Sequence, residues 1–153
     1  MDTRLYNSLR KSIIFKDVSE VNFNEIVNEI PFRILDYKKN EILFFEGDDC
    51  NSIGIVLDGE VEVNKGLTIG KKVNITKIKA GDMFAEAVVF SQYHKFPATI
   101  EASSDSKVLF ISRENIVKMC SKYPDFIEKF MGILSTKISI LNTKVSIFFI
   151  KIV

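Results

Sequence analysis

The sequence predicts a mainly β domain, a jelly roll with flanking helices, followed by one long C-terminal helix. Seven short runs of alternating apolar residues, separated by turn-forming residues at nearly regular spacing, fill residues 31–112. Residues 113–153 then place apolar side chains at helical spacing. A chain of 153 residues with 46% hydrophobic content suits a single domain with its own core.

Composition excludes several classes of protein. The net charge of +1 provides no general attraction to nucleic acid. The two cysteines, Cys50 and Cys120, are too far apart in the sequence to suggest a disulfide framework or a metal cluster. The N-terminal residues are polar, and no apolar run reaches the length of a membrane span, so we expect a cytoplasmic protein without a signal peptide.

Residues 1–30 predict two helices. The first covers residues 5–15, and the second begins at the N-cap Ser19, ends at Pro31 and places Val21, Ile26 and Ile30 on its apolar side. A helix-turn-helix that reads DNA is the alternative interpretation. The second helix carries three glutamates and no lysine or arginine, which is the wrong sign for that role, so a helical cover on the sheet is favoured.

Residues 31–112 predict the β-roll. Asp58-Gly59, between two apolar runs, is the strongest hairpin signal, and Gly66 to Gly70 marks a second turn. The predicted strands are Phe32–Leu35, Ile42–Phe44, Ile53–Leu57, Glu60–Val63, Val73–Ile78, Ala98–Ala102 and Lys107–Ile111.

The stretch from Gly81 to Ala102 interrupts this pattern. After the Gly81-Asp82 turn, residues 84–90 change to a helical period, with Glu86 near the start of the predicted turn. A carboxylate suits the positive end of a helix, and free amides there could bind an anion. Pro97 then begins the next strand. We therefore expect a concave backbone in this stretch.

The same stretch carries a family resemblance. Its pattern G-D-x-F-x-E-x-x-x-F, followed by Ala98 and Ala102, resembles the phosphate-binding cassette of the cyclic nucleotide-binding domain. It is most similar to the sensor domain of bacterial Crp/Fnr-type transcription regulators, the catabolite activator protein family. The resemblance covers roughly residues 31–145 and implies a cyclic-nucleotide-binding-like double-stranded β-helix, a long dimerisation helix and a small-molecule effector.

The cassette departs from the family pattern at the phosphate contacts. The family's Phe-Gly-Glu is Phe84-Ala85-Glu86 here, and its Arg-Ser/Thr-Ala is Phe96-Pro97-Ala98. Phenylalanine cannot replace the bidentate guanidinium, and proline has no N–H to donate. The adjacent Lys95 would point to the other face of an extended segment. We therefore expect weak or no binding of cyclic AMP and cyclic GMP, and a flatter, more apolar effector.

The resemblance also implies which residues line the effector site. Glu86 would fix polar atoms of the ligand, and Phe96 would pack against it. Counting from the cassette without gaps places Asn142 where the family's long helix meets the ligand. The expected lining is Phe84, Ala85, Glu86, Phe96, Pro97, Ala98 and Asn142.

Residues 113–153 predict a short helix, capped by Ser112, and then the long helix with an unbroken heptad seam. β-branched residues at position a with leucine at position d favour a parallel two-stranded coiled coil, and hence a homodimer. The alternative is a core helix buried against its own domain. The apolar row Ile133, Ile140 and Ile147 indicates that the helix also packs on the β-roll. The expected dimer interface is Ile127, Met131, Leu134, Ile138, Leu141, Val145, Phe148 and Ile152.

We therefore expect an effector-sensing and dimerisation domain of a Crp/Fnr-type regulator. Such regulators continue into a winged helix-turn-helix that this sequence lacks, so no direct DNA binding by this chain alone is expected. A metal cupin would need several histidines, and the chain has only His94. No catalytic residue, metal site or cofactor is expected. Two alternatives stay open: an atypical cyclic AMP or cyclic GMP sensor, and an effector-free dimerisation module whose pocket is filled by Phe84, Phe90 and Phe96.

Overall fold

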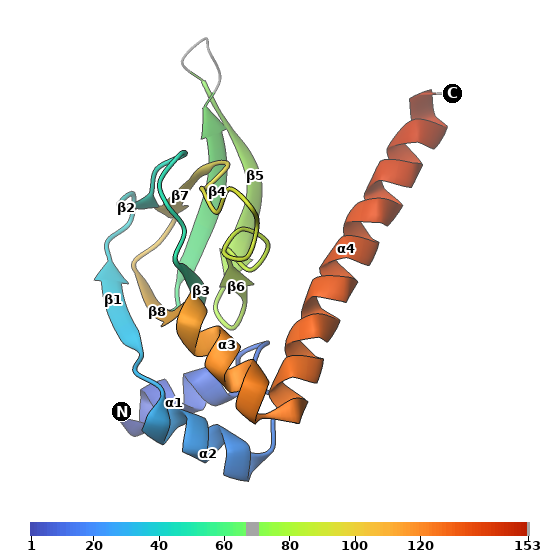
Figure 1. The fold of residues 1–153 in the computed structure, drawn as a ribbon. Helices are drawn as coiled ribbons and strands as arrows, with labels where there is room; N and C mark the ends of the chain where they lie inside the picture. The colour runs from blue at the N-terminus through green and yellow to red at the C-terminus, as the bar shows by residue number, and fades with distance from the viewer. Residues whose placement is uncertain (67–70, 153) are drawn as a thin grey trace.

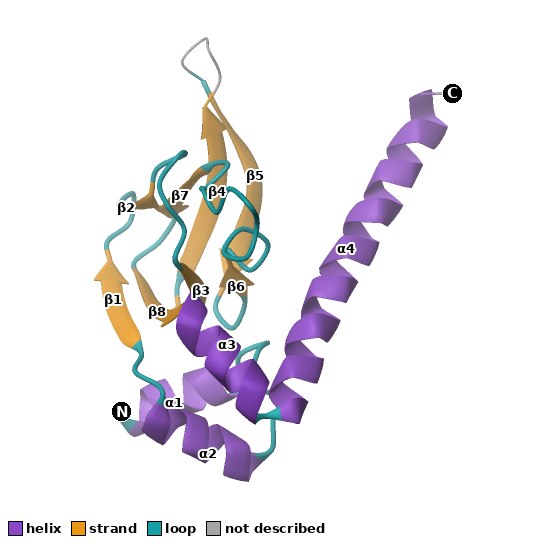
Figure 2. Ribbon diagram, viewed as in Figure 1, coloured by secondary structure: helices purple, strands orange, loops and turns teal. Residues whose placement is uncertain are grey.

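The computed structural model describes residues 1–66 and 71–152, with the backbone alone for residues 147–152. A β-roll stands on a base of three short helices, and a long helix leaves this base beside the roll (Figures 1 and 2). The helices are α1 (Thr3–Arg10), α2 (Glu20–Glu29), α3 (Arg113–Lys122) and α4 (Pro124–Ile152).

The β-roll consists of two four-stranded antiparallel sheets, which confirms the predicted jelly roll. All seven predicted strands are present, with ends that differ by up to three residues. An eighth strand, β6, was not predicted, because it is only two residues long. One sheet has the order β1 (Arg33–Tyr37), β8 (Ser106–Ser112), β3 (Ser52–Asp58) and β6 (Met83–Phe84). The other has the order β2 (Ile42–Phe44), β7 (Thr99–Ala102), β4 (Glu60–Gly66) and β5 (Lys72–Lys79).

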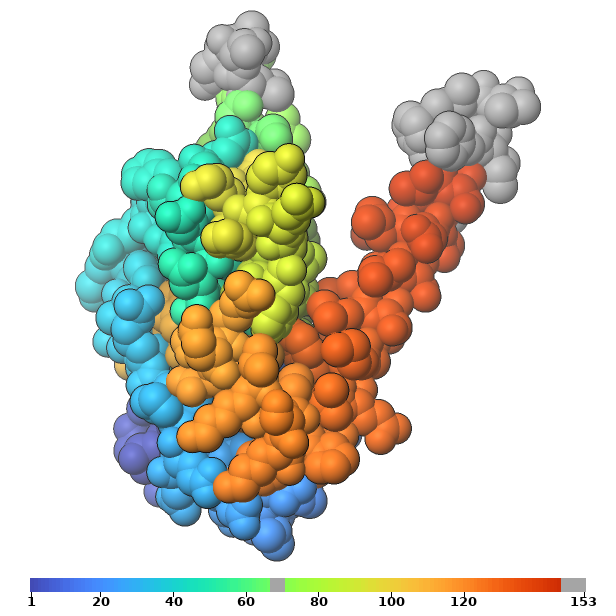
Figure 3. Space-filling model, in the orientation of Figure 1, coloured from blue at the N-terminus to red at the C-terminus, as the bar shows by residue number. Residues whose placement is uncertain are grey.

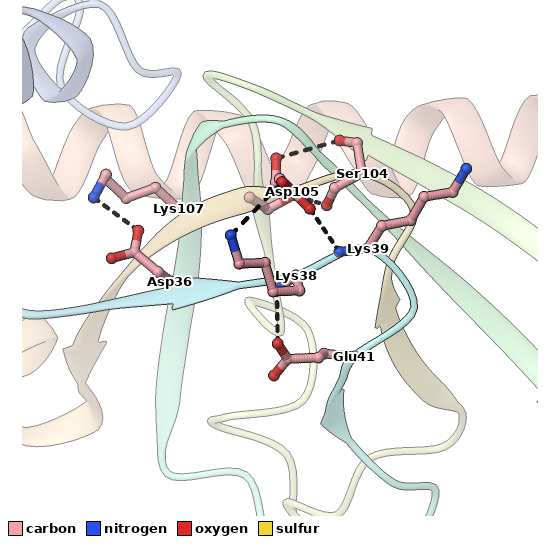
Figure 4. Close-up of polar contacts among 8 residues, drawn as sticks. Asp36, Lys38, Lys39, Glu41, Ser104, Asp105 and Lys107 are labelled. Carbon is pink, nitrogen blue, oxygen red and sulfur yellow. Dashed lines mark hydrogen bonds and ion pairs between the residues drawn. The ribbon is translucent and has the colours of Figure 1, made fainter.

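Polar contacts fasten the turn after β1 to the turn before β8 (Figure 4). The backbone N–H of Lys39 donates to Asp105 Oδ1 at 2.9 Å, and Lys38 Nζ lies 4.0 Å from the other oxygen of that carboxylate. Lys107 pairs with Asp36 at 2.8 Å across the same two strands. These contacts hold the two turns together.

The N-terminal helices cover the base of the roll, as predicted, and Ser19 caps α2 through the amide of Asn22 at 3.2 Å. The first helix is shorter than predicted, because α1 ends at Arg10 and turns follow. The prediction that Val21 faces the core is wrong. Val21 is 70% exposed, and Phe23 is buried instead, packed against Phe15 with ring centroids 5.3 Å apart.

The first part of helix α4 packs against the base of the domain, and its later residues are exposed. Phe126, Phe130 and Ile133 are buried against the base, whereas residues 138–146 are all exposed. The expectation that Ile140 packs on the roll is therefore wrong, since its side chain is 51% exposed, whereas Ile133 of the same predicted row is buried. Ile147 lies outside the residues whose side chains are described. None of the described helices is both long and apolar enough to cross a membrane.

The predicted heptad seam lies mostly in solvent, so the alternative of a helix buried entirely in its own domain is wrong. Leu134 is half-buried, and Phe148 and Ile152 lie outside the residues whose side chains are described. The exposed members of the seam are Ile127, Met131, Ile138, Leu141 and Val145.

Candidate functional site

A cavity of about 370 Å³ lies between the cassette, the β4–β5 sheet and α4. Six of the seven predicted effector residues line it, whereas Asn142 is exposed and is not among the lining residues. The predicted residues in the lining are Phe84, Ala85, Glu86, Phe96, Pro97 and Ala98. The remainder of the lining is Val63, Thr76, Lys77, Ile78, Asp82, Met83, Ala87, Val88, Ile100 and Lys137.

The cassette backbone forms a helical turn after Ala85, as predicted, but no regular helix. Phe84 belongs to β6, and Ala85 adopts a φ of 70°, a left-handed conformation that costs a non-glycine residue about 1–2 kcal/mol. The amides of Val88 and Val89 then donate to the Ala85 carbonyl at 3.1 and 3.0 Å, and the amide of Ser91 donates to the Val88 carbonyl at 3.0 Å, so the segment consists of turns and not of a regular α-helix. The argument from a helix dipole at Glu86 is therefore wrong.

The amides at the start of this turn are nevertheless free. Within the part of the chain that the structure describes, the backbone N–H groups of Glu86 and Ala87 have no acceptor. Both residues line the cavity. An acceptor atom of a ligand can therefore be bound there by two adjacent amides.

Phe96, which stands in the position of the family's arginine, belongs to an aromatic core. Its ring is 3% exposed and stacks on Phe44 at a centroid distance of 4.3 Å. Phe84 packs edge-on to Phe44 and Phe110, at 6.5 and 6.2 Å. Phe84 and Phe96 form the apolar floor of the cavity, and Phe44 and Phe110 pack against them.

Lys95 does not supply the missing positive charge. Its ammonium pairs with Asp49 at 2.6 Å on the surface, and the two residues also form an isolated β-bridge. The hydrogen bond from Lys95 holds the pKa of the Asp49 carboxyl below its ordinary value, as does the ammonium charge. The prediction that Lys95 points away from the site agrees with this placement.

Two lysines line the cavity, Lys77 from β5 and Lys137 from α4. The Lys137 ammonium donates to the Glu86 carboxylate, lies 3.6 Å from Asp82 Oδ1 and 3.5 Å from the Met83 carbonyl oxygen. The Glu86 side chain is only 10% exposed. Glu86, which the sequence assigned to the ligand, is thus already engaged by a residue of its own chain.

The sequence does contain signals for part of the missed lining. Val63, Ile78 and Ile100 are apolar positions of predicted strands, and a pocket inside a roll is lined by the inward-facing positions of such strands. Lys137 had no such signal, because the heptad spacing puts it at position g, directly before the seam residue Ile138, and nothing in the sequence connects it to the cassette. His94 is half-buried in the loop before Lys95 and does not line the cavity.

The model of the cyclic nucleotide-binding domain matches residues 34–123, which is more than half of the chain and includes the whole cassette. The chain belongs to the cyclic nucleotide-binding domain family. Among curated proteins, none matches the sequence significantly.

Solved structures of transcription regulators share the fold of this cyclic nucleotide-binding domain. A regulator from Thermotoga maritima has 22% identity and a TM-score of 0.72, over 80% of this chain and 93% of that one. The sensor domain of the regulator DNR from Pseudomonas aeruginosa has 18% identity and a TM-score of 0.74, over 92% and 90%. The Thermus thermophilus catabolite activator protein has 16% identity and a TM-score of 0.75, over 90% and 63%.

Proposed function

We propose that this cyclic nucleotide-binding domain is the effector-sensing and dimerisation domain of a Crp/Fnr-type transcription regulator whose effector is not a cyclic nucleotide. The observation that carries the proposal is the cavity between cassette and α4, which is lined by the buried Phe96 where the family resemblance would place a phosphate-binding arginine. A bound effector would contact both the roll and the dimerisation helix, and would bias α4 between two arrangements.

The lining supports a flat ligand with an apolar body. Phe84, Phe96 and Ile100 provide apolar walls, and the polar lining includes the Glu86–Lys137 pair as well as Thr76 and Lys77 of β5. No arginine is among the lining residues, so a cyclic phosphate would lose the bidentate guanidinium contact and would depend on the two free amides and on Lys77 and Lys137. We expect a substantial loss of affinity for cyclic AMP and cyclic GMP from this change.

The exposed heptad seam supports a parallel homodimer through α4. Five exposed apolar side chains in one row are unusual for a monomeric protein. Asn142 follows Lys137 by five residues, about 140° around the helix. It thus faces away from its own cavity, and in a parallel pair it would approach the cavity of the partner.

The effector-free module is less well supported. Phe84 and Phe96 are buried as that alternative requires, but a cavity of about 370 Å³ remains beside them. Phe90 does not fill it, since its ring is partly exposed and packs on Phe130 at 6.3 Å.

Thermal-shift titration tests the effector half of the proposal. The purified chain is titrated with cyclic AMP, cyclic GMP and a panel of small aromatic acids and phenols. Binding to the folded state adds about 2.7 kcal/mol at a hundredfold excess over Kd, so we expect a raised Tm with an aromatic probe and not with the nucleotides. A shift with cyclic nucleotides alone would contradict the proposed ligand class, and no shift at all would favour the effector-free module.

A matched pair of variants tests whether the shift arises in this cavity. Ala87 is exposed at the cavity lining, so Ala87→Trp should abolish the shift. Gln92 is exposed nearby and does not line the cavity, so Gln92→Trp should leave the shift unchanged. If the probe raises Tm equally in the two variants, it binds outside this cavity.

Light scattering after gel filtration tests the dimer half. We expect a mass of two 17.4-kDa chains at micromolar protein. Ile138→Glu places a charge in the seam and should give a monomer, whereas Ser139→Glu, one residue along and outside the seam, should remain dimeric. Both side chains are exposed in the single chain, so neither change should unfold it. A wild-type chain that is monomeric would remove the dimer from the proposed function.

A further inference from the structure

Lys137 is the last residue of α4, among those whose side chains are described, that makes a hydrogen bond or ion pair with the β-roll. It continues the row of Phe126, Phe130 and Ile133, which anchors the helix to the base. From residue 138 to residue 146 every side chain is exposed. Figure 3 shows this distal half of α4 standing clear of the roll. The polar contacts of Lys137 are therefore the outermost tie between helix and roll.

The tie is made to a shielded carboxylate. Glu86 is 10% exposed on its side chain, and Lys137 is 36% exposed. A carboxylate removed from water to this degree is unfavourable without a hydrogen-bond donor. Moving the Lys137 ammonium away would leave Glu86 unpaired, and this cost holds Lys137 in place. The carboxylate of Asp82, at 3.6 Å, adds a second negative charge beside the same ammonium.

The Lys137 contact lies at a point on α4 where a small change in tilt produces a large displacement of the distal part of the helix. Fifteen residues of α4 follow Lys137, a length of about 22 Å at the rise of an α-helix. The exposed seam residues Ile138, Leu141 and Val145 lie on this distal part. A change in the tilt of α4 would therefore move the surface that the proposed function assigns to the dimer.

We propose that Lys137 is a positioning residue that fixes the angle of α4 to the roll through Glu86. A ligand that satisfies Glu86 with its own hydroxyl or amine donors releases Lys137 and thereby the distal half of α4. The role of the ligand rests on the proposed function, whereas the role of the Lys137–Glu86 contact in positioning α4 does not. The effector class is accordingly a molecule with an apolar body and hydrogen-bond donors at one end.

Distances between two spin labels test the tie without any ligand. The labels are placed at Val73→Cys on β5 and Ser146→Cys on α4, both exposed positions, in a Cys120→Ala background that retains the buried Cys50. Ser146 lies roughly 20 Å along α4 from Ile133, so a tilt of about 10° moves it by about 3 Å. Labelled chain is diluted with excess unlabelled chain, so that only distances within one chain are measured in a dimer.

Lys137→Met and Glu86→Gln should each shift or broaden the distance distribution by about 3 Å or more. Lys137→Arg, which keeps the charge, should restore the wild-type distribution. Lys144→Met is the matched control, because Lys144 lies one heptad further on the same face and is exposed, so it should have no effect. A wild-type distribution in Lys137→Met would overturn the proposal, as would equal shifts in Lys137→Met and Lys144→Met. If Lys137→Met moves α4 while no probe raises Tm, the tie stands and the proposed effector function fails.

Discussion

Replacing Phe84 by alanine is expected to destabilise the domain by about 3–5 kcal/mol, the cost of removing a large buried ring. Phe84 is 3% exposed and packs among Phe44, Phe110 and the backbone of Gly54. A Cβ added to Gly54 would lie 2.1 Å from Cζ of that ring, so no side chain fits there while Phe84 keeps its place. Gly54→Ala alone should therefore also destabilise, by about 2–4 kcal/mol through overpacking.

The two changes should not be additive. In the Phe84→Ala background the ring is gone, and the Gly54→Ala methyl enters the space that it leaves. We expect a double-mutant coupling of at least about 2 kcal/mol in favour of the double variant. Urea unfolding of the four proteins, followed by far-UV circular dichroism, measures it. If the losses in free energy of unfolding are additive, Phe84 does not pack on Gly54, and the described packing at the floor of the cavity is wrong.

Replacing Gly59 by alanine is expected to cost about 3 kcal/mol, because two effects combine. Gly59 has a φ of 83°, where a Cβ costs about 1–2 kcal/mol by itself. That Cβ would also lie 2.3 Å from the Asp105 carbonyl oxygen and 2.4 Å from Ser106 Oγ. Backbone cannot move aside as a flexible side chain can, and Figure 4 shows how the turn containing Asp105 is fastened to residues 38 and 39.

Two other glycines separate these effects. Gly47 and Gly81 have φ values of 92° and 95°, and a Cβ on either would meet nothing within 4 Å. Gly47→Ala and Gly81→Ala should thus lower the free energy of unfolding only by the cost of a left-handed backbone, about 1–2 kcal/mol. Thermal unfolding of the three variants gives the comparison. Equal losses in Tm at all three positions would contradict the close contact between the Asp58-Gly59 turn and the turn before β8.

Local patterns were sufficient for most of the fold. Alternation along each run predicted seven strands because a sheet covered on one side requires apolar residues at every second position. Asp58-Gly59 forms its hairpin, with a left-handed glycine, and Ser19 and Ser112 cap their helices through amides three residues on. The cassette pattern also brought six predicted residues to one cavity, since they lie close together in the chain.

Tertiary structure decided the rest, because periodicity identifies the apolar face of an element but not the neighbour that covers it. Ile133 and Ile140 share one face of α4, yet only Ile133 is buried, since the base of the domain ends between them. Lys137 had the sequence signature of a coiled-coil flank, but a residue 51 positions earlier, Glu86, decides its contact. Ala85 adopts a left-handed conformation that its residue type disfavours, at the junction between strand β6 and the turn that follows. The sequence by itself therefore determined the roll, the Asp58-Gly59 turn and six of the residues that line the cavity. The charge at the cavity and the attachment of α4 arise only when distant segments meet.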